Sequence, residues 1–360
     1  MSDRNLVIRA GARAGDRLRE VGFHPDLFGT LVGASGGPKW LVLRHLDTVL
    51  IDRLVLARST SLDTLGSSIG SFRHACYAQS APHVALACFE PAYVEQAYAE
   101  EDLDRRGLPS PEAITRESEN VLANLLGDVG AKEICEHPRL RTSIVAARLV
   151  RDRGRDRGLA FQLQVARAAA ANALSRRRLG RHVERVVFQT EGAGLDWRDL
   201  PTARESLTPE RLERAILSSG SIPFVMEGVR DVPGVPGTLF DGGIVDYHFD
   251  FEFERDDRLV LYPHFFDKIT PGWFDKPWKK RRPTAAALDD VVMIAPSDAF
   301  VATLPGGKVP DRGDFLDFAP EQRVDRWYGV IESCRVLAEE LAEAIDGGRF
   351  AERVEPFPDA

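Results

Sequence analysis

One serine in this sequence stands between two glycines in a spacing that suits a nucleophile. Residues 65 to 72 read LGSSIGSF, in which Gly66 and Gly70 flank Ser68 at a distance of two residues. Small residues at these positions allow a sharp turn that exposes a serine hydroxyl at the end of a strand. Such a hydroxyl attacks an acyl carbonyl when a proton acceptor and oxyanion donors lie beside it. The same spacing occurs in packing turns, so the partners of Ser68 decide the question.

A second glycine-rich stretch offers donors for an oxyanion. Residues 33 to 40 read GASGGPKW, and its consecutive glycines, Gly36 and Gly37, could direct backbone N–H groups at a negative charge. The stretch does not fit a nucleotide-binding P-loop. Pro38 stands where that loop requires glycine, and Trp40 stands where it requires serine or threonine. We therefore expect an oxyanion hole here, and no nucleotide.

The candidate base is an aspartate that follows a short apolar run. Residues 240 to 243 read FDGG, so Asp241 lies at an expected strand end, and Gly242 and Gly243 allow a close approach of backbone or substrate. An aspartate with a pKa near 4 is a poor base in water and needs burial beside the hydroxyl. We therefore expect Asp241 to lie in a largely apolar pocket.

A histidine base is the alternative. Ordinary α/β-hydrolases place their serine, acid and histidine in that order, with the histidine late in the chain. Only His248 and His264 follow Asp241, and their sequence surroundings are more typical of packed or edge-strand histidines. A third hypothesis is that the protein has the fold of such a hydrolase but no catalytic activity, and that it binds lipid or has a regulatory role.

Alternating strands and helices position these residues. The pattern predicts strands at 27–34, 62–65, 143–150 and 183–190, and helices at 39–54 and 69–79. This alternation is typical of an α/β sheet with a site at the carboxyl ends of its strands. The glycine-bearing strand ends at Gly36, Ser68 and Asp241 would then converge on one edge of one sheet.

Longer helical segments complete the expected organisation. We expect one domain over residues 1–360, with a core over about 27–270 and a helical insertion over about 90–140. A C-terminal extension over about 271–360 would contain a long amphipathic helix at 320–345. An alanine-rich helix is expected at 164–178, with three arginines in a last turn where cations suit the helix dipole.

The ordered motifs resemble those of the patatin-like phospholipases. That family has a glycine-rich oxyanion loop, then Gly-x-Ser-x-Gly, then Asp-Gly-Gly, and SSGSIPF at 218–224 resembles a further family segment. The resemblance covers roughly residues 27–246. It implies a three-layer α/β/α sandwich of patatin type and a serine–aspartate dyad, Ser68 and Asp241, without histidine. The resemblance also implies a hydrolase of lipid esters that needs no cofactor. The oxyanion donors would be Gly36 and Gly37, with Lys39, Gly66, Gly70, Gly242 and Gly243 as supporting motif residues.

Composition limits the class of protein. The chain has 360 residues, 44% of them hydrophobic, and a formal net charge of −8, which argues against a nucleic-acid-binding protein. Four cysteines lack the spacing of a metal site. The N-terminus lacks the apolar run of a signal peptide, and no stretch is long enough for a membrane span. We expect a cytoplasmic protein.

One short segment is positively charged, whereas the chain as a whole has a net negative charge. Residues 273 to 283 read WFDKPWKKRRP and combine aromatic rings with cations, which suits the headgroup region of an anionic membrane. The alternative is a solvated loop whose tryptophans fold back onto the protein. The candidate residues for peripheral membrane contact are Trp273, Trp278, Lys279, Lys280, Arg281 and Arg282.

Overall fold

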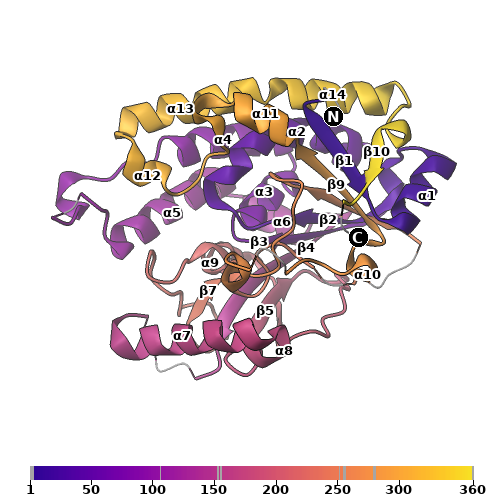
Figure 1. The fold of residues 1–360 in the computed structure, drawn as a ribbon. Coiled ribbons are helices and arrows are strands. Elements are labelled where there is room, and N and C mark those ends of the chain that lie inside the picture. The colour runs from indigo at the N-terminus through magenta and orange to yellow at the C-terminus, as the bar shows by residue number, and fades with distance from the viewer. Residues whose placement is uncertain are drawn as a thin grey trace.

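A single mixed sheet forms the centre of the molecule and has helices on both faces. The structure is a computed structural model, and it describes residues 4–105, 107–151, 154, 156–250, 252–253, 257–278 and 281–358. Within these residues ten strands form the sheet, in the order β10-β1-β9-β8-β2-β3-β4-β5-β6, and β7 pairs with β4. Figure 1 shows α2, α4, α13 and α14 above the sheet and α7 and α8 below it. The predicted α/β class with flanking helices is confirmed.

The strands are β1 Leu6–Ala10, β2 Phe28–Gly33, β3 Leu62–Ser67, β4 Leu140–Leu149, β5 Val183–Gln189, β6 Thr202–Ser206, β7 Leu239–Asp241, β8 Leu259–Pro263, β9 Val291–Pro296 and β10 Val354–Pro356. The α-helices are α1 Ala12–Val21, α2 Arg44–Leu50, α3 Ile69–Tyr77, α4 Pro82–Val94, α5 Pro111–Leu126, α6 Gly130–Cys135, α7 Gly158–Leu174, α8 Arg176–Leu179, α9 Pro209–Gly220, α10 Ala285–Leu288, α11 Asp298–Thr303, α12 Asp314–Asp317, α13 Pro320–Ser333 and α14 Arg335–Asp346.

Two parallel strands at the centre of the sheet carry the two glycine-rich turns. Strands β2 and β3 are buried at every residue, including polar ones such as Thr30 and Asp63, as expected for central parallel strands covered on both faces. Gly33 at the end of β2 is in register with Gly66 near the end of β3, so both turns leave the sheet at one edge. After the first turn the chain continues as a 3₁₀ helix, Gly37–Leu43, and then as α2. After the second turn it enters α3 directly.

Strand β4 is longer than its neighbours, and this length creates the meeting point of the site. Its first half pairs in parallel with β3, up to the register of Ser67 with Val145. Beyond that point Ala146 to Arg148 pair with the antiparallel β7, while β5 occupies the opposite side of β4. Strand β7 therefore takes the place of β3 where β3 ends, and the C-terminal ends of β3 and β7 point at each other.

The C-terminal region contributes to the sheet itself. Strand β9, in the segment expected to lie outside the core, pairs with both β1 and β8. Strand β10 forms the edge beside β1. The sheet thus extends well beyond residue 270. The predicted single helix over 320–345 is two helices, α13 and α14, which meet at Cys334.

The expected insertion is helical. Between β3 and β4 the chain forms α3, α4, a 3₁₀ turn at Glu100–Asp102, α5 and α6. Helix α5 begins at Pro111, where the Ser110 side chain accepts a hydrogen bond from the Ala113 N–H and so caps the helix. Helices α4 and α5 pack together and cover α3, the helix that follows Ser68.

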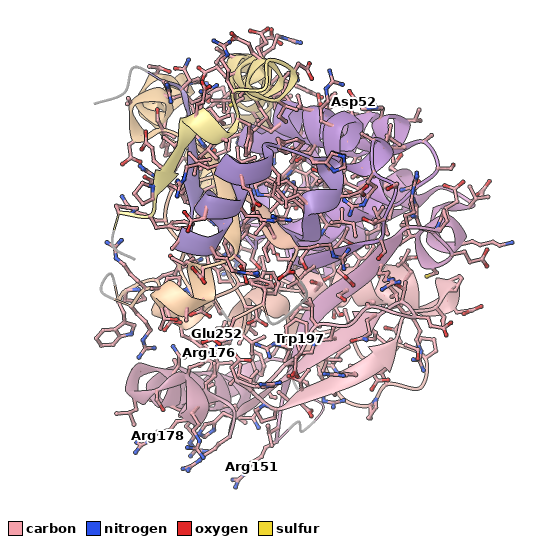
Figure 2. All side chains as sticks on the ribbon, turned by 90° about the vertical axis from the view of Figure 1, so that its right-hand side faces the viewer. Asp52, Arg151, Arg176, Arg178, Trp197 and Glu252 are labelled. Atoms are coloured by element: carbon pink, nitrogen blue, oxygen red, sulfur yellow. The ribbon has the colours of Figure 1, made fainter. Side chains whose placement is uncertain are left out.

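The arginine run after α7 does not lie in the last turn of that helix, so this expectation is wrong. Helix α7 ends at Leu174, and Arg176 begins the separate short helix α8. Arg176 turns inward and forms ion pairs with Asp199 and Asp246. Arg178 is exposed, and Figure 2 shows it pointing away from the protein body. A buried ionic contact, not the helix dipole, accounts for Arg176.

Candidate active site

Ser68 occupies a strained turn between β3 and α3. Its backbone has φ 53° and ψ −127°, one of two positive-φ conformations among the described non-glycine residues. Such a conformation costs about 1–3 kcal/mol and persists only where the surrounding structure enforces it. The side chain of Ser68 is buried but lines a pocket at the sheet edge. The sharp turn expected from the Gly-x-Ser-x-Gly spacing is therefore present.

A second serine holds the backbone of Ser68. The Ser68 N–H donates to the Ser219 hydroxyl oxygen at 2.9 Å, and the Ser219 hydroxyl donates to the carbonyl oxygen of Val145 at 2.6 Å. The hydroxyl of Ser71 also lies 3.0 Å from that of Ser219. The Ser68 N–H is thus already engaged within the protein and is not available to an oxyanion. Ser219 lies in the SSGSIPF segment, for which the sequence suggested a family resemblance but no role.

The glycine at the start of α3 allows the turn to pack closely on β2. A Cβ atom at Gly70 would clash with the backbone carbonyl of Gly33. The first turn of α3, directly after Ser68, therefore lies against the end of the neighbouring strand β2. This close approach gives a physical reason for the second glycine of the motif.

Asp241 lies within hydrogen-bonding distance of Ser68. The Ser68 hydroxyl donates to Asp241 Oδ2 at 2.8 Å, and the N–H of Gly243 donates to Asp241 Oδ1 at 2.6 Å. The backbone N–H of Asp241 donates to the carbonyl oxygen of Ser221 at 2.8 Å, which fixes the end of β7. Burial raises the pKa of Asp241 above its ordinary value, although the bonds from Ser68 and Gly243 oppose this shift. A carboxylate in this setting is a stronger base than one in water.

The glycine-rich loop after β2 borders the same pocket. Gly36 and Gly37 both line it, and Gly37 has φ +56°, a conformation that a side chain would strain. Within the described residues, neither backbone N–H donates to another protein group. Two free donors thus lie at the pocket that contains Ser68, as an oxyanion hole requires.

Three cations line this pocket as well. Lys39 follows the glycine loop, Lys276 follows the 3₁₀ turn Trp273–Asp275, and Arg312 precedes α12. The sequence pointed to Lys39 only. Lys276 belongs to the segment 273–283, for which the sequence suggested membrane contact, and Arg312 lies where no motif was found, so their presence at the site was not foreseen.

A large apolar cavity opens beside the small pocket. Its volume is about 680 Å³, and its walls include Phe72 of α3, Ile114 and Val121 of α5, Phe224 and Phe315. Both hollows share Gly37, Ser68, Ile222, Pro223, Trp273 and Arg312. Ser68 therefore lies at the junction of a small polar pocket and a large apolar cavity. The helical insertion supplies one wall of that cavity.

Neither histidine of the alternative triad reaches Ser68. His248 and His264 pack against each other with ring centroids 4.3 Å apart, and neither lines the pocket. The Nδ1 atom of His248 accepts from the N–H of Thr270, and that of His264 lies within hydrogen-bonding distance of the backbone of Phe266. Burial lowers the pKa of His264 to about 3 and places that of His248 well below its usual value. Both are packed, neutral side chains.

The membrane-contact candidates are not gathered on one exposed face. Trp273 is half-buried at the junction of the two hollows, while Trp278 is exposed. Arg281 donates to the carboxylate of Asp275 and to the backbone carbonyl of Asn172. Arg282 also has a partner within the protein. Lys279 and Lys280 lie outside the described residues. Among the residues that the structure describes, Trp273 and Arg281 thus contact the protein body, whereas Trp278 is exposed.

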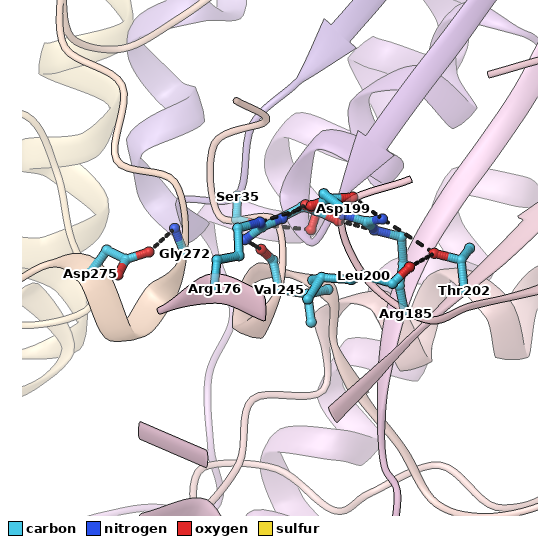
Figure 3. A network of polar contacts seen from close by, with 11 residues as sticks. Ser35, Arg176, Arg185, Asp199, Leu200, Thr202, Val245, Gly272 and Asp275 are labelled. Carbon is cyan, nitrogen blue, oxygen red and sulfur yellow. Dashed lines mark hydrogen bonds and ion pairs between the residues drawn. The ribbon is translucent and has the colours of Figure 1, made fainter. Parts of the chain in front are cut away.

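A buried ionic cluster anchors the loop that follows Asp241. Asp246 accepts two hydrogen bonds from Arg185, at 2.6 and 2.8 Å, and one from Arg176 at 2.6 Å. Both arginines also bind Asp199, and Figure 3 shows their guanidinium groups meeting around it. The side chains of Arg185 and Asp246 are completely buried. The cluster ties α8 and β5 to the Asp-Gly-Gly loop.

Fold and site together define an α/β protein with a buried serine–aspartate pair. No family model and no curated protein sequence matches the chain. Among solved structures, VipD from Legionella pneumophila is similar with a TM-score of 0.36 and 10% sequence identity, covering 88% of this chain and 67% of that one. Within the described residues, no helix could cross a bilayer and no group of side chains is arranged to hold a metal ion. We therefore derive a function from the geometry of the site itself.

Proposed function

We propose that this protein is a serine acyl hydrolase that cleaves lipid esters with Ser68 as nucleophile and Asp241 as base. The observation that carries the proposal is the 2.8 Å hydrogen bond from the Ser68 hydroxyl to Asp241, at a strained turn beside an apolar cavity. Strained backbone at a solvent-accessible nucleophile is typical of functional sites. The two free N–H groups of Gly36 and Gly37 complete the set of groups that acyl transfer requires.

The proposed reaction has two halves. Asp241 accepts the hydroxyl proton as Ser68 Oγ bonds to the ester carbonyl carbon, and the N–H groups of Gly36 and Gly37 bind the resulting oxyanion. When the carbon–oxygen bond to the alcohol breaks, the Asp241 carboxyl returns the proton to the leaving oxygen. Water then attacks the acyl-serine, gives its proton to Asp241, and releases the acid as Ser68 regains its hydrogen. No cofactor takes part in this scheme.

A covalent probe tests the nucleophile directly. We expect a fluorophosphonate reagent to label the purified protein and the Ser68→Ala variant to remain unlabelled, because only the activated hydroxyl displaces the fluoride. Labelling is read by intact-protein mass spectrometry, with Ser80→Ala as a matched control at an exposed serine. A folded protein that takes up no label would instead support a binding or regulatory protein without catalytic activity.

The apolar cavity predicts a preference for longer acyl chains. Each buried methylene contributes about 0.8 kcal/mol, or about fourfold in kcat/KM. We expect Ile114→Trp, which fills part of the cavity, to lower kcat/KM for a decanoyl ester at least tenfold and to spare a butanoyl ester. Hydrolysis of p-nitrophenyl esters with these two acyl chains measures kcat/KM. Leu163→Trp on the exposed side of α7 is the control, and an equal loss for both chain lengths would exclude the cavity as the acyl site.

A further inference from the structure

Three cationic side chains face the small pocket from separate parts of the chain. Lys39, Lys276 and Arg312 line it together with Ser68 and Asp241. Within the described residues, none of the three forms an ion pair or a side-chain hydrogen bond with another protein group. Lys276 is exposed, but its ammonium lies over the ring of Tyr247, 4.0 Å from the ring centroid, and Tyr247 also lines the pocket.

The nearby carboxylates are already engaged. Asp241 binds the Ser68 hydroxyl, and it is the single carboxylate among the residues described as lining the pocket. Asp311 accepts the N–H of Gly313 and pairs with Lys308, while Asp314 accepts from Arg326 and Trp327. In a chain of net charge −8, three cations that share the pocket with a single carboxylate, itself bound by the Ser68 hydroxyl, indicate a place for an anionic ligand.

The electrostatics of the lysines agree with this geometry. Partial burial of the ammonium group, together with Arg312 and Lys39, lowers the pKa of Lys276 to about 8. Burial also lowers the pKa of Lys39. The cations thus lie close enough to disfavour one another's charge, and an anion between them would relieve that repulsion.

We propose that Lys39, Lys276 and Arg312 bind a phosphate group on the alcohol side of the scissile ester, in substrates that carry no positively charged headgroup. This inference rests on the proposed function, and it identifies the substrates of the proposed hydrolase as esters whose alcohol carries a phosphate group. Because the apolar cavity on one side of Ser68 suits the acyl chain, the small cationic pocket is left for the alcohol. A quaternary ammonium next to the phosphate would meet three cations, and the ring of Tyr247 already faces Lys276.

Binding to the Ser68→Ala protein tests the inference without turnover. Titration calorimetry would compare three monomeric ligands with the same acyl chain: monohexanoyl glycerol phosphate, monohexanoyl glycerophosphocholine and monohexanoyl glycerol. We expect the phosphate ester to bind at least tenfold more tightly than either of the others, because monohexanoyl glycerol has no phosphate for charge-assisted contacts and the cations repel the choline ammonium of the phosphocholine. Equal affinities would overturn the proposal. Inorganic phosphate serves as a fourth ligand, and affinity equal to that of the ester would mean a site for a free anion and overturn it as well.

Substitution of two of the three cationic residues provides a second test of the phosphate site. In the Ser68→Ala background, Lys276→Met and Arg312→Met should each reduce the preference for the phosphate ester over monohexanoyl glycerol about tenfold. Lys268→Met, at an exposed lysine paired with Asp298 outside the pocket, should leave that ratio unchanged. An unchanged ratio in Lys276→Met and Arg312→Met would overturn the proposal. Fluorophosphonate labelling of the wild-type protein is independent of this outcome, so failure of the substrate class and failure of the proposed function are distinguishable.

Discussion

Replacement of Asp241 with asparagine is expected to lower kcat/KM about 10⁴-fold while the protein stays folded. Asparagine keeps the shape and still accepts the hydrogen bond from Ser68, but it cannot take up the proton. Ester hydrolysis by the purified variant measures the loss. The control is His248→Asn, in which the amide oxygen can still accept from Thr270. A comparable loss in His248→Asn with an unchanged fold would contradict an aspartate base and favour a histidine.

The same residue sets an expected pH dependence. Burial raises the pKa of Asp241, and the base must be ionised to accept a proton. On acidification, kcat/KM should therefore begin to fall at a higher pH than it would for an ordinary carboxylate, whose pKa is near 4.

The stability of the fold should depend on the same group. Because folding raises the pKa of Asp241, its carboxyl group stabilises the fold at low pH, and that contribution is lost as the pH rises through the folded-state pKa. In Asp241→Asn the loss of this buried charge favours the fold at neutral pH, whereas the amide nitrogen can no longer accept from the Gly243 N–H, so the Tm should stay close to that of the wild type. A marked drop in Tm would mean that the charge itself stabilises the fold.

The second large effect concerns stability. Asp246→Asn should lower the free energy of unfolding by about 3–5 kcal/mol, because it leaves Arg176 and Arg185 with too little negative charge in a buried cluster. Urea denaturation measures the change, and activity should fall with it because the cluster anchors the loop after Asp241. Asp52→Asn is the matched control, since Figure 2 shows Asp52 at the surface, where its carboxylate pairs with the half-exposed His83. A loss below about 1 kcal/mol for Asp246→Asn would show that the cluster contributes little.

The sequence predicted the elements that depend on local pattern. The strand–turn–helix units around Gly36 and Ser68 lie at 28–33, 37–50, 62–67 and 69–77, close to the expected ranges. Their signals are a short run that contains large apolar residues, then a turn with glycine, and then apolar residues at helical spacing. Ser68 and Asp241 were paired from motif order and from the family resemblance, and the structure places them in hydrogen-bonding contact.

Features that depend on distant pairing were not predicted. Strands β6 and β10 are short and not deeply buried, so their residues lack the apolar pattern of a core strand. Lys276 and Arg312 reach the pocket through loops whose course depends on tertiary packing. Arg176 looked like a helix-end cation because nothing local reveals that Asp246, far along the chain, lies within hydrogen-bonding distance. Local spacing carries no information about such partners.

The end-to-end meeting of β3 and β7 has a consequence for how activity appears during folding. Ser68 and Asp241 are separated by 173 positions, and β7 is only three residues long. Contacts of such long range form late in folding, and a short strand with few ladder bonds opens before the rest of its sheet. Release of β7 from β4 would separate base from nucleophile while β2 to β5 keep their pairing. Inactivation by denaturant should then precede the loss of secondary structure, and recovered hydrolysis would report the last stage of refolding.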